Sequence, residues 1–206
     1  YCYLEFVRLT RAMERLPKTM RMDIGHGAFQ LDESLPREGV DKYGFLSKLI
    51  PPEVLDPMID ILCEQFEDLD MEEMNRTGLL GNSALAHRLQ IWAETNLTRT
   101  RSLALKDELF KIHSIKGRSM GDVDAIIEAA ASAGLTDESL VRSVLKDPKY
   151  IDRFKKQKKR ARETYGIESV PCLVLIEANT GKHRKLDDAT GIETVDGFSD
   201  LIAKHL

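Results

Sequence analysis

The stretch that decides the fold is Ser169-Val170-Pro171-Cys172-Leu173-Val174-Leu175-Ile176. Its last five residues are continuously apolar, and this length and composition are typical of a β-strand buried on both faces. A Val-Pro step directly before such a strand is unusual, because proline cannot donate a ladder hydrogen bond. Cis prolines cluster in tight functional turns, although the sequence leaves the isomer of Pro171 open. We therefore predict a buried strand over 172–176, preceded by a turn at Val170-Pro171.

A second landmark, Cys2, lies about 170 residues earlier, at the predicted start of an amphipathic helix that ends before Pro17. The apolar positions of this helix recur every three or four residues; they are Phe6, Leu9, Met13 and Leu16. The positive end of a helix dipole and the unpaired N–H groups there stabilise a thiolate. Cys2 is therefore a candidate reactive thiol, and the alternative is an inert cysteine near a chain end.

The segments around these landmarks indicate an α/β chain with a helical insertion. Residues 19–31 alternate in polarity and predict a strand, in which Gly25 and Gly27 suggest a bulge or a close backbone approach. Residues 40–165 are helical almost throughout. A second strand over 185–190 and a helix over 194–206 close the chain. We expect a domain formed by 1–39 and 166–206, divided by an insertion domain at 40–165.

Within the insertion, turn residues and periodicity predict where the helices begin. Asp56-Pro57 supplies an N-cap and a first-turn proline, and Asn82-Ser83 and Asp147-Pro148 open two further helices. Other helices are expected over 103–112, 123–131 and 140–145, the last capped by Thr136. The inward-facing side chains of the helix after Pro57 are expected to be Met58, Ile61, Leu62 and Phe66.

Composition narrows the class of protein. The chain has 206 residues, 42% of them apolar and 31% charged, which is ordinary for a soluble globular protein. The net charge of -4 argues against general affinity for nucleic acid, and no apolar run is long enough for a membrane span. Three cysteines do not form a secreted disulfide framework, so we expect a reducing, cytoplasmic compartment. The chain begins without Met, and we expect its natural N-terminus to be absent.

The remaining reactive side chains receive structural interpretations. Cys63 and Cys172 are expected to be small buried side chains. The five histidines have no ligand-type spacing with one another or with the cysteines, so we expect no metal site. A cationic run is interpreted as a solvated helix face, with an acidic partner as the alternative; it comprises Lys155, Lys156, Lys158, Lys159, Arg160 and Arg162.

Several segments together resemble the DsbA-like thioredoxin superfamily, in particular its FrnE-type branch. Tyr1-Cys2-Tyr3-Leu4 is similar to the second half of the Cys-Pro-Trp-Cys-Tyr-Ile motif, and Ser169-Val170-Pro171 is similar to the Gly-Val-Pro loop. The segment 82–89, Asn-Ser-Ala-Leu-Ala-His-Arg-Leu, resembles the Asn-Thr-x-x-Ala-His-Arg-Leu helix. Residues 29–32 and 35–39 resemble the segment that follows the strand after the first helix in that family. The resemblance covers nearly the whole chain.

The resemblance implies a thioredoxin-like fold split by an all-helical insertion, with the first strand missing from the sequence. Cys2 would be the resolving cysteine, and the nucleophilic cysteine would precede Tyr1 by two residues. Pro171 would shape the catalytic site, while Tyr1, Val170 and Asn82 would contact substrate. The implied activity is thiol–disulfide exchange with no bound cofactor, acting on protein thiols or disulfides or on glutathione as a co-substrate.

Two alternatives use the same scaffold. If serine replaces the missing cysteine, the resemblance points to kappa-class glutathione transferases and 2-hydroxychromene-2-carboxylate isomerases. Those proteins typically bind glutathione with an Asp beside the last helix, and the corresponding stretch here, 189–194, lacks it. The third interpretation is a redox-inactive binding protein. The sequence leaves the oligomeric state open, a homodimer included.

Overall fold

The computed structural model describes residues 1–17, 22–186, 192 and 194–204. Contacts divide the chain into two compact units, unit 1 (Tyr1–Gly25 and Lys159–Leu206) and unit 2 (His26–Lys158). The sequence-based domain limits at 39/40 and 165/166 stay a prediction. The compact units change at 25/26 and 158/159 instead, because residues 26–39 interact with the helices of unit 2.

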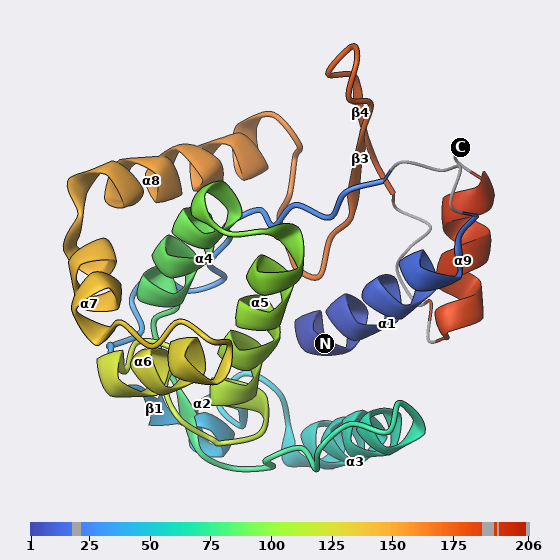
Figure 1. Ribbon diagram of the computed structural model, residues 1–206. Helices are drawn as coiled ribbons and strands as arrows, with labels where there is room; N and C mark the ends of the chain where they lie inside the picture. Colours follow the sequence, from blue (N-terminus) through green and yellow to red (C-terminus); the bar gives the residue numbers. More distant parts are fainter. Residues whose placement is uncertain (18–21, 187–191, 193, 205–206) are drawn as a thin grey trace. The chain divides into compact units, whose positions relative to one another are not determined.

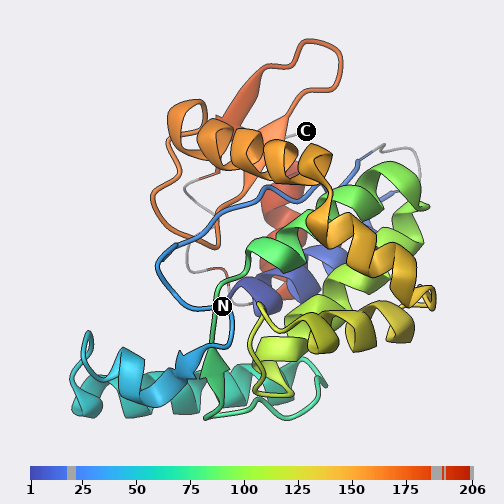
Figure 2. The ribbon, with the colours of Figure 1, turned by 90° about the vertical axis from the view of Figure 1, so that its left-hand side faces the viewer.

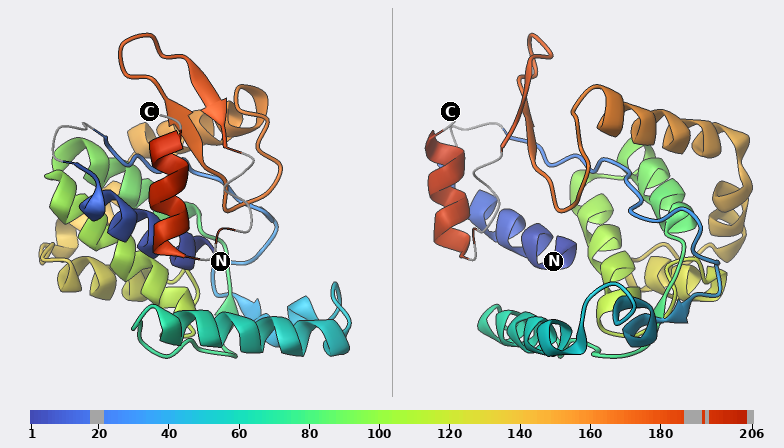
Figure 3. Two further views of the ribbon diagram at one scale, coloured as in Figure 1. Left: turned by 90° about the vertical axis from the view of Figure 1, so that its right-hand side faces the viewer. Right: turned by 180° about the vertical axis from the view of Figure 1, so that it is seen from behind.

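In the described part of unit 1, α1 (Cys2–Arg15) packs on α9 (Val195–Lys204). The two helices lie side by side (Figure 3). Ala12 on α1 and Phe198 on α9 are fully buried in one apolar cluster together with Ile202. An ion pair between Arg15 and Asp196 also joins the two helices. The prediction of a helix from Cys2 is confirmed, and its end follows from Leu16, whose extended backbone precedes Pro17.

The hairpin of unit 1 pairs β3 (Val174–Ile176) with β4 (His183–Lys185) in antiparallel register, Val174 opposite Lys185. The prediction that this strand is buried on both faces is wrong, because Ile176 is 47% exposed. Among the described residues β4 is the only strand beside β3, and its three residues are all exposed. β4 also begins two residues before the predicted strand at 185–190, of which 187–190 lie outside the described residues.

The predicted strand at 19–31 is not formed in residues 22–31, and 19–21 lie outside the described residues. Extended backbone becomes a strand only when a neighbouring strand pairs with it. Here side chains take the place of that partner. The backbone N–H groups of His26 and Ala28 donate to the side chains of Glu94 at 2.8 Å and Gln157 at 3.1 Å. Gly25 and Gly27 mark no bulge, and each has open space where a Cβ would lie.

Unit 2 is mainly helical (Figure 1). A short antiparallel pair joins β1 (Val40–Asp41) to β2 (Leu79–Leu80). The helices are α2 (Lys42–Leu46), α3 (Pro52–Asp68), α4 (Ala84–Asn96), α5 (Arg99–Ser114), α6 (Val123–Ser132), α7 (Glu138–Lys146) and α8 (Pro148–Glu163). The boundary between the units falls within α8, so its last turn belongs to unit 1.

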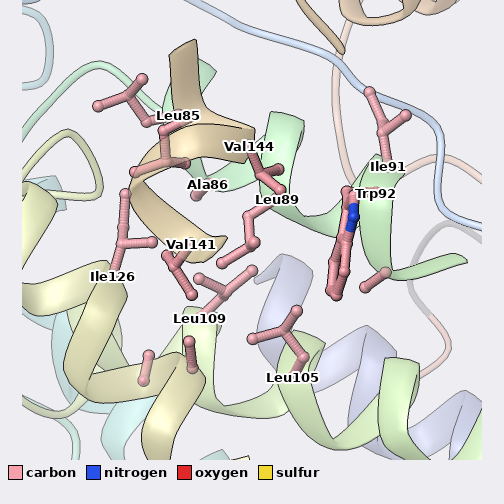
Figure 4. Packing of buried hydrophobic residues seen from close by; sticks show 14 of the residues in the cluster. Leu85, Ala86, Leu89, Ile91, Trp92, Leu105, Leu109, Ile126, Val141 and Val144 are labelled. Atoms are coloured by element: carbon pink, nitrogen blue, oxygen red, sulfur yellow. The ribbon is translucent and has the colours of Figure 1, made fainter. Parts of the chain in front are cut away.

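The core of unit 2 lies among α4, α5, α6 and α7 (Figure 4). Leu89, Leu105, Ile126 and Val141 come from these four helices, and all four side chains are fully buried. Apolar residues at spacings of three and four place one face of each helix in this core. The predicted helices at 103–112, 123–131 and 140–145 are therefore confirmed, each slightly longer than expected.

Two predicted helix starts are wrong. α3 begins at Pro52 rather than Pro57, so Pro57 lies inside the helix and α3 lacks the hydrogen bond that residue 57 would donate to Glu53. This places Leu55, Ile59 and Phe66 inside, while Ile61 is 49% exposed. α7 is capped by Asp137, whose Oδ1 accepts from the N–H of Leu140 at 2.9 Å, and not by Thr136.

Candidate functional site

Cys2 is the first residue of α1 and is half-buried. Tyr1 occupies the N-cap position, is exposed, and makes no side-chain cap hydrogen bond. Its carbonyl accepts the first helical hydrogen bond, from the N–H of Glu5 at 3.0 Å. The first N–H groups of an α-helix have no partner within the helix. A thiolate at Cys2 therefore lies where both these donors and the helix dipole favour negative charge.

Two charged side chains follow Cys2 on α1 at intervals of three residues, so each is a neighbour of the one before it on the helix surface. These are Glu5 and Arg8, with Arg8 Nη1 3.7 Å from Glu5 Oε1. Burial raises the pKa of Glu5 to about 7, and the nearby Arg8 opposes this shift. Near neutral pH much of the Glu5 population is thus uncharged, which limits its repulsion of a thiolate at Cys2.

The Val170–Pro171 peptide bond is cis. Val170 is half-buried and Pro171 exposed, in the loop that leads from α8 to β3. This loop belongs to the same unit as α1 and turns near its N-terminal end in each view (Figures 1 and 3). The structure thus brings together, in unit 1, the two segments that hold Cys2 and Pro171. Cys172, predicted to be buried, is half-buried, and so is Cys63 in unit 2.

Asn82 belongs to unit 2, where its side chain is held by three hydrogen bonds. Its Oδ1 accepts from Gln30 Nε2 and from the N–H of Ala84, both at 3.0 Å, and its Nδ2 donates to the carbonyl of Glu33 at 3.1 Å. These contacts give Asn82 a structural role at the start of α4. Its predicted role in binding substrate stays a prediction.

A lysine from α8 completes this polar cluster. Lys158 Nζ lies 2.6 Å from Glu33 Oε2 and donates to Gln30 Oε1 at 3.2 Å, and its side chain is only 15% exposed. The interpretation of Lys158 as part of a solvated cationic face is therefore wrong. Gln30 and Glu33 were not candidates, because 125 or more residues separate them from Lys158 and no local pattern joins such positions.

The described residues meet neither the requirements for a membrane-spanning helix nor those for a metal site. None of the helices in the described part of the chain is both long and apolar enough to span a membrane. Over the same residues, no group of three His, Cys, Asp or Glu side chains is arranged to hold a metal ion. The stretch at 189–194, which bears on the glutathione alternative, is described only at Ile192 and Thr194.

Comparison with known proteins identifies the fold. The family model described as a DSBA-like thioredoxin domain matches residues 1–203. A crystal structure of a probable DsbA oxidoreductase from Streptomyces coelicolor is similar with a TM-score of 0.77 and 23% sequence identity, over 99% of this chain and 84% of that chain. No curated protein matches the sequence. The predicted fold class, thioredoxin-like with a helical insertion, is confirmed, while assignment to the FrnE branch stays a prediction.

Proposed function

Because the chain belongs to the family of DSBA-like thioredoxin domains, we propose that it is a thiol–disulfide oxidoreductase in which Cys2 is the resolving cysteine. The observation that carries the proposal is the position of Cys2 at the first residue of α1. A cysteine at a helix N-terminus is the group that thiol–disulfide exchange requires, because the thiolate is the attacking species.

The proposed reaction has two exchange steps. The thiolate of a first cysteine, two residues before Tyr1, attacks a substrate disulfide; a mixed disulfide forms and one substrate thiolate leaves. The Cys2 thiolate then attacks the sulfur of that first cysteine, which breaks the mixed disulfide and releases the second substrate thiolate. The cysteine pair is oxidised to a disulfide while the substrate gains two electrons. The reverse sequence oxidises a dithiol substrate.

The surroundings of Cys2 support the second step. The thiol of Cys2 must lose its proton before it attacks, and the N-terminal N–H groups of α1 favour the resulting negative charge. Glu5, one turn away, has a pKa raised to about 7, so at pH 7 only part of its population is charged and its opposition to a thiolate is reduced. The exposed Tyr1 and the Val170-Pro171 loop lie in the same unit and are the proposed contacts for the substrate chain, with Asn82 as a further candidate.

We propose protein thiols or disulfides as substrates, with glutathione as a co-substrate and no bound cofactor. A cytoplasmic location and a homodimer stay predictions from the sequence. No observation in the described residues favours the glutathione transferase or the redox-inactive alternative over disulfide exchange.

The proposal is tested by insulin or glutathione-disulfide reduction with the full-length protein. Cys2→Ser is expected to abolish turnover, because the mixed disulfide is no longer resolved within the protein. Cys63→Ser is the matched control; that residue lies in unit 2 on α3, so the substitution is expected to leave turnover unchanged. No activity in the wild type, or equal turnover in wild type and Cys2→Ser, contradicts the proposal.

A further inference from the structure

Helix α3 carries an exposed apolar stripe in addition to its buried face. Val54 and Ile61 are 54% and 49% exposed, and Met58 lies half-buried between them. The spacings of four and three residues place these side chains along one line of the helix. The buried Leu55, Ile59 and Phe66 occupy an adjoining side. We call Val54, Met58 and Ile61 the α3 stripe.

The other side of α3 is acidic. Six exposed carboxylates occur between Pro52 and Asp68 with no Lys or Arg among them; they are Glu53, Asp56, Asp60, Glu64, Glu67 and Asp68. Two of them are engaged, Asp56 by the Tyr43 hydroxyl at 2.8 Å and Asp60 by Arg76. At 100° per residue, Glu53, Glu64 and Asp68 follow the edge of the α3 stripe.

The position of α3 within unit 2 leaves this surface accessible. In Figures 1 and 2, α3 lies below the bundle of α4, α5, α6 and α7 and outside it. Leu49, three residues before α3 begins, is also strongly exposed. An exposed apolar strip bordered by charge is typical of a surface that binds another molecule.

Charge restricts the occupant. Pairing α3 with α3 of a second copy would bring two sets of carboxylates together, which is unfavourable. The cationic face of α8 in a second copy offers no apolar side chain, since its exposed residues there are Lys155, Lys156, Lys159, Arg160 and Arg162. Membrane surfaces are generally anionic and would be repelled. A cationic amphipathic peptide is complementary to both parts of the surface, because its apolar side chains match the α3 stripe and its cations match the carboxylates.

We infer that the α3 stripe and its carboxylates form a docking site for a cationic amphipathic segment of a polypeptide partner. The apolar side chains of that segment cover Val54, Met58 and Ile61, and its Lys or Arg side chains face Glu53 and Glu64. Apolar contact then supplies most of the affinity, while the charges set orientation and association rate. The inference does not depend on redox activity.

The test measures binding of a fluorescent 14-residue amphipathic peptide of Leu and Lys by anisotropy, with a Leu and Glu peptide as the charge control. Ile61→Gln is expected to weaken binding about tenfold, the typical effect of truncating a central contact. Glu64→Lys is expected to weaken binding and to reduce its dependence on salt. Leu31→Gln, at another strongly exposed leucine of unit 2, is the matched control and is expected to bind as wild type.

Three results overturn the inference: no binding of the Leu and Lys peptide, equal binding by wild type and Ile61→Gln, or equal binding of the Leu and Glu peptide. A dimer that Ile61→Gln converts to monomer also overturns it, because the occupant is then a second copy. Thermal unfolding of each variant checks that the fold is retained. Since no disulfide exchange is measured, failure here is distinct from failure of the proposed oxidoreductase activity.

Discussion

The two units differ in how their interiors are formed. In unit 2, four helices bury a continuous apolar core that contains Leu89, Leu105 and Ile126. In unit 1, the described clusters are small, one formed by Ala12 with Phe198 and Ile202 and another by Leu186 with Leu201. The candidate thiol Cys2 belongs to the unit with the smaller described core. Its helix α1 packs on α9 through Ala12, and it buries Leu4 as well.

The units also differ in their buried ionisable groups. Unit 2 buries histidines: burial lowers the pKa of His87 to about 3 and that of His113 to about 4, and it lowers the pKa of His26 as well. In unit 1, burial raises the pKa of the acid Glu5 to about 7. The two units are therefore expected to respond to pH in opposite directions.

The largest expected effect separates the two cores. Phe198→Ala is expected to lower the free energy of unfolding by about 3–5 kcal/mol and to speed alkylation of Cys2, because it removes the main contact between α1 and α9. Leu109→Ala in unit 2 is expected to cost about 2–5 kcal/mol. It should leave Cys2 alkylation in the native state unchanged. Urea unfolding and timed alkylation with mass spectrometry measure both quantities.

Equal acceleration of Cys2 alkylation by Phe198→Ala and Leu109→Ala would contradict this comparison. It would mean that the accessibility of Cys2 on α1 depends on the core of unit 2 as much as on the small core of unit 1.

Acid should destabilise unit 2 through His87, whose ring stacks on Phe154 and whose Nε2 lies 3.0 Å from the carbonyl of Phe29. The unfolded chain takes up a proton below pH 6.5, whereas the buried ring stays neutral down to about pH 3. Stability attributable to this ring is therefore complete above pH 6.5 and falls with pH. The loss is about 1.4 kcal/mol per pH unit, or about 3 kcal/mol by pH 4.5.

The measurement is amide hydrogen exchange of α4 at pH 6.5 and pH 4.5, corrected for the intrinsic exchange rate. Protection that is unchanged or greater at pH 4.5 would show that His87 is not the controlling group.

Glu5 should act in the opposite direction in unit 1. Its raised pKa contributes stability that is complete below pH 4.5 and is lost as the pH rises through about 7. Wild type should therefore lose about 2 kcal/mol between pH 5 and pH 7.5 that Glu5→Gln retains. Urea unfolding of both proteins at the two pH values measures the difference, and an identical pH dependence would refute the assignment.

The smallest effect concerns the start of α7. Asp137→Ala is expected to destabilise by about 1 kcal/mol, because it removes the side-chain acceptor for the N–H of Leu140. Thr136→Ala, the residue first predicted as the cap, should change stability by less than about 0.5 kcal/mol. Thermal unfolding distinguishes the two, and the reverse order would restore Thr136 as the cap.

What the sequence predicted correctly depends on local signals. Periodicity and capping residues located α1, α4 and α8, and the position of Cys2 followed from the start of α1. Two prolines five residues apart, Pro52 and Pro57, each fit a helix start, so local sequence could not decide where α3 begins. The prediction of a strand at 19–31 was wrong in the described residues 22–31, because alternating polarity does not show whether a partner strand exists.

The candidate site was predictable to a similar extent. Cys2 and Pro171 were found from their local context and from motif resemblance. The ion pair of Lys158 with Glu33 was not, because it joins residues 125 positions apart. The raised pKa of Glu5 was also missed, because it depends on burial that a sequence pattern does not specify.

The most direct test of the oxidoreductase proposal is trapping of the mixed disulfide. Full-length Cys2→Ser is mixed with a peptide disulfide and the products are separated without reductant for mass spectrometry. We expect Cys2→Ser to accumulate a covalent adduct with the peptide, while wild type releases the peptide and forms its internal disulfide. No adduct in Cys2→Ser, or the same amount in both proteins, would contradict the role of Cys2 as the resolving cysteine.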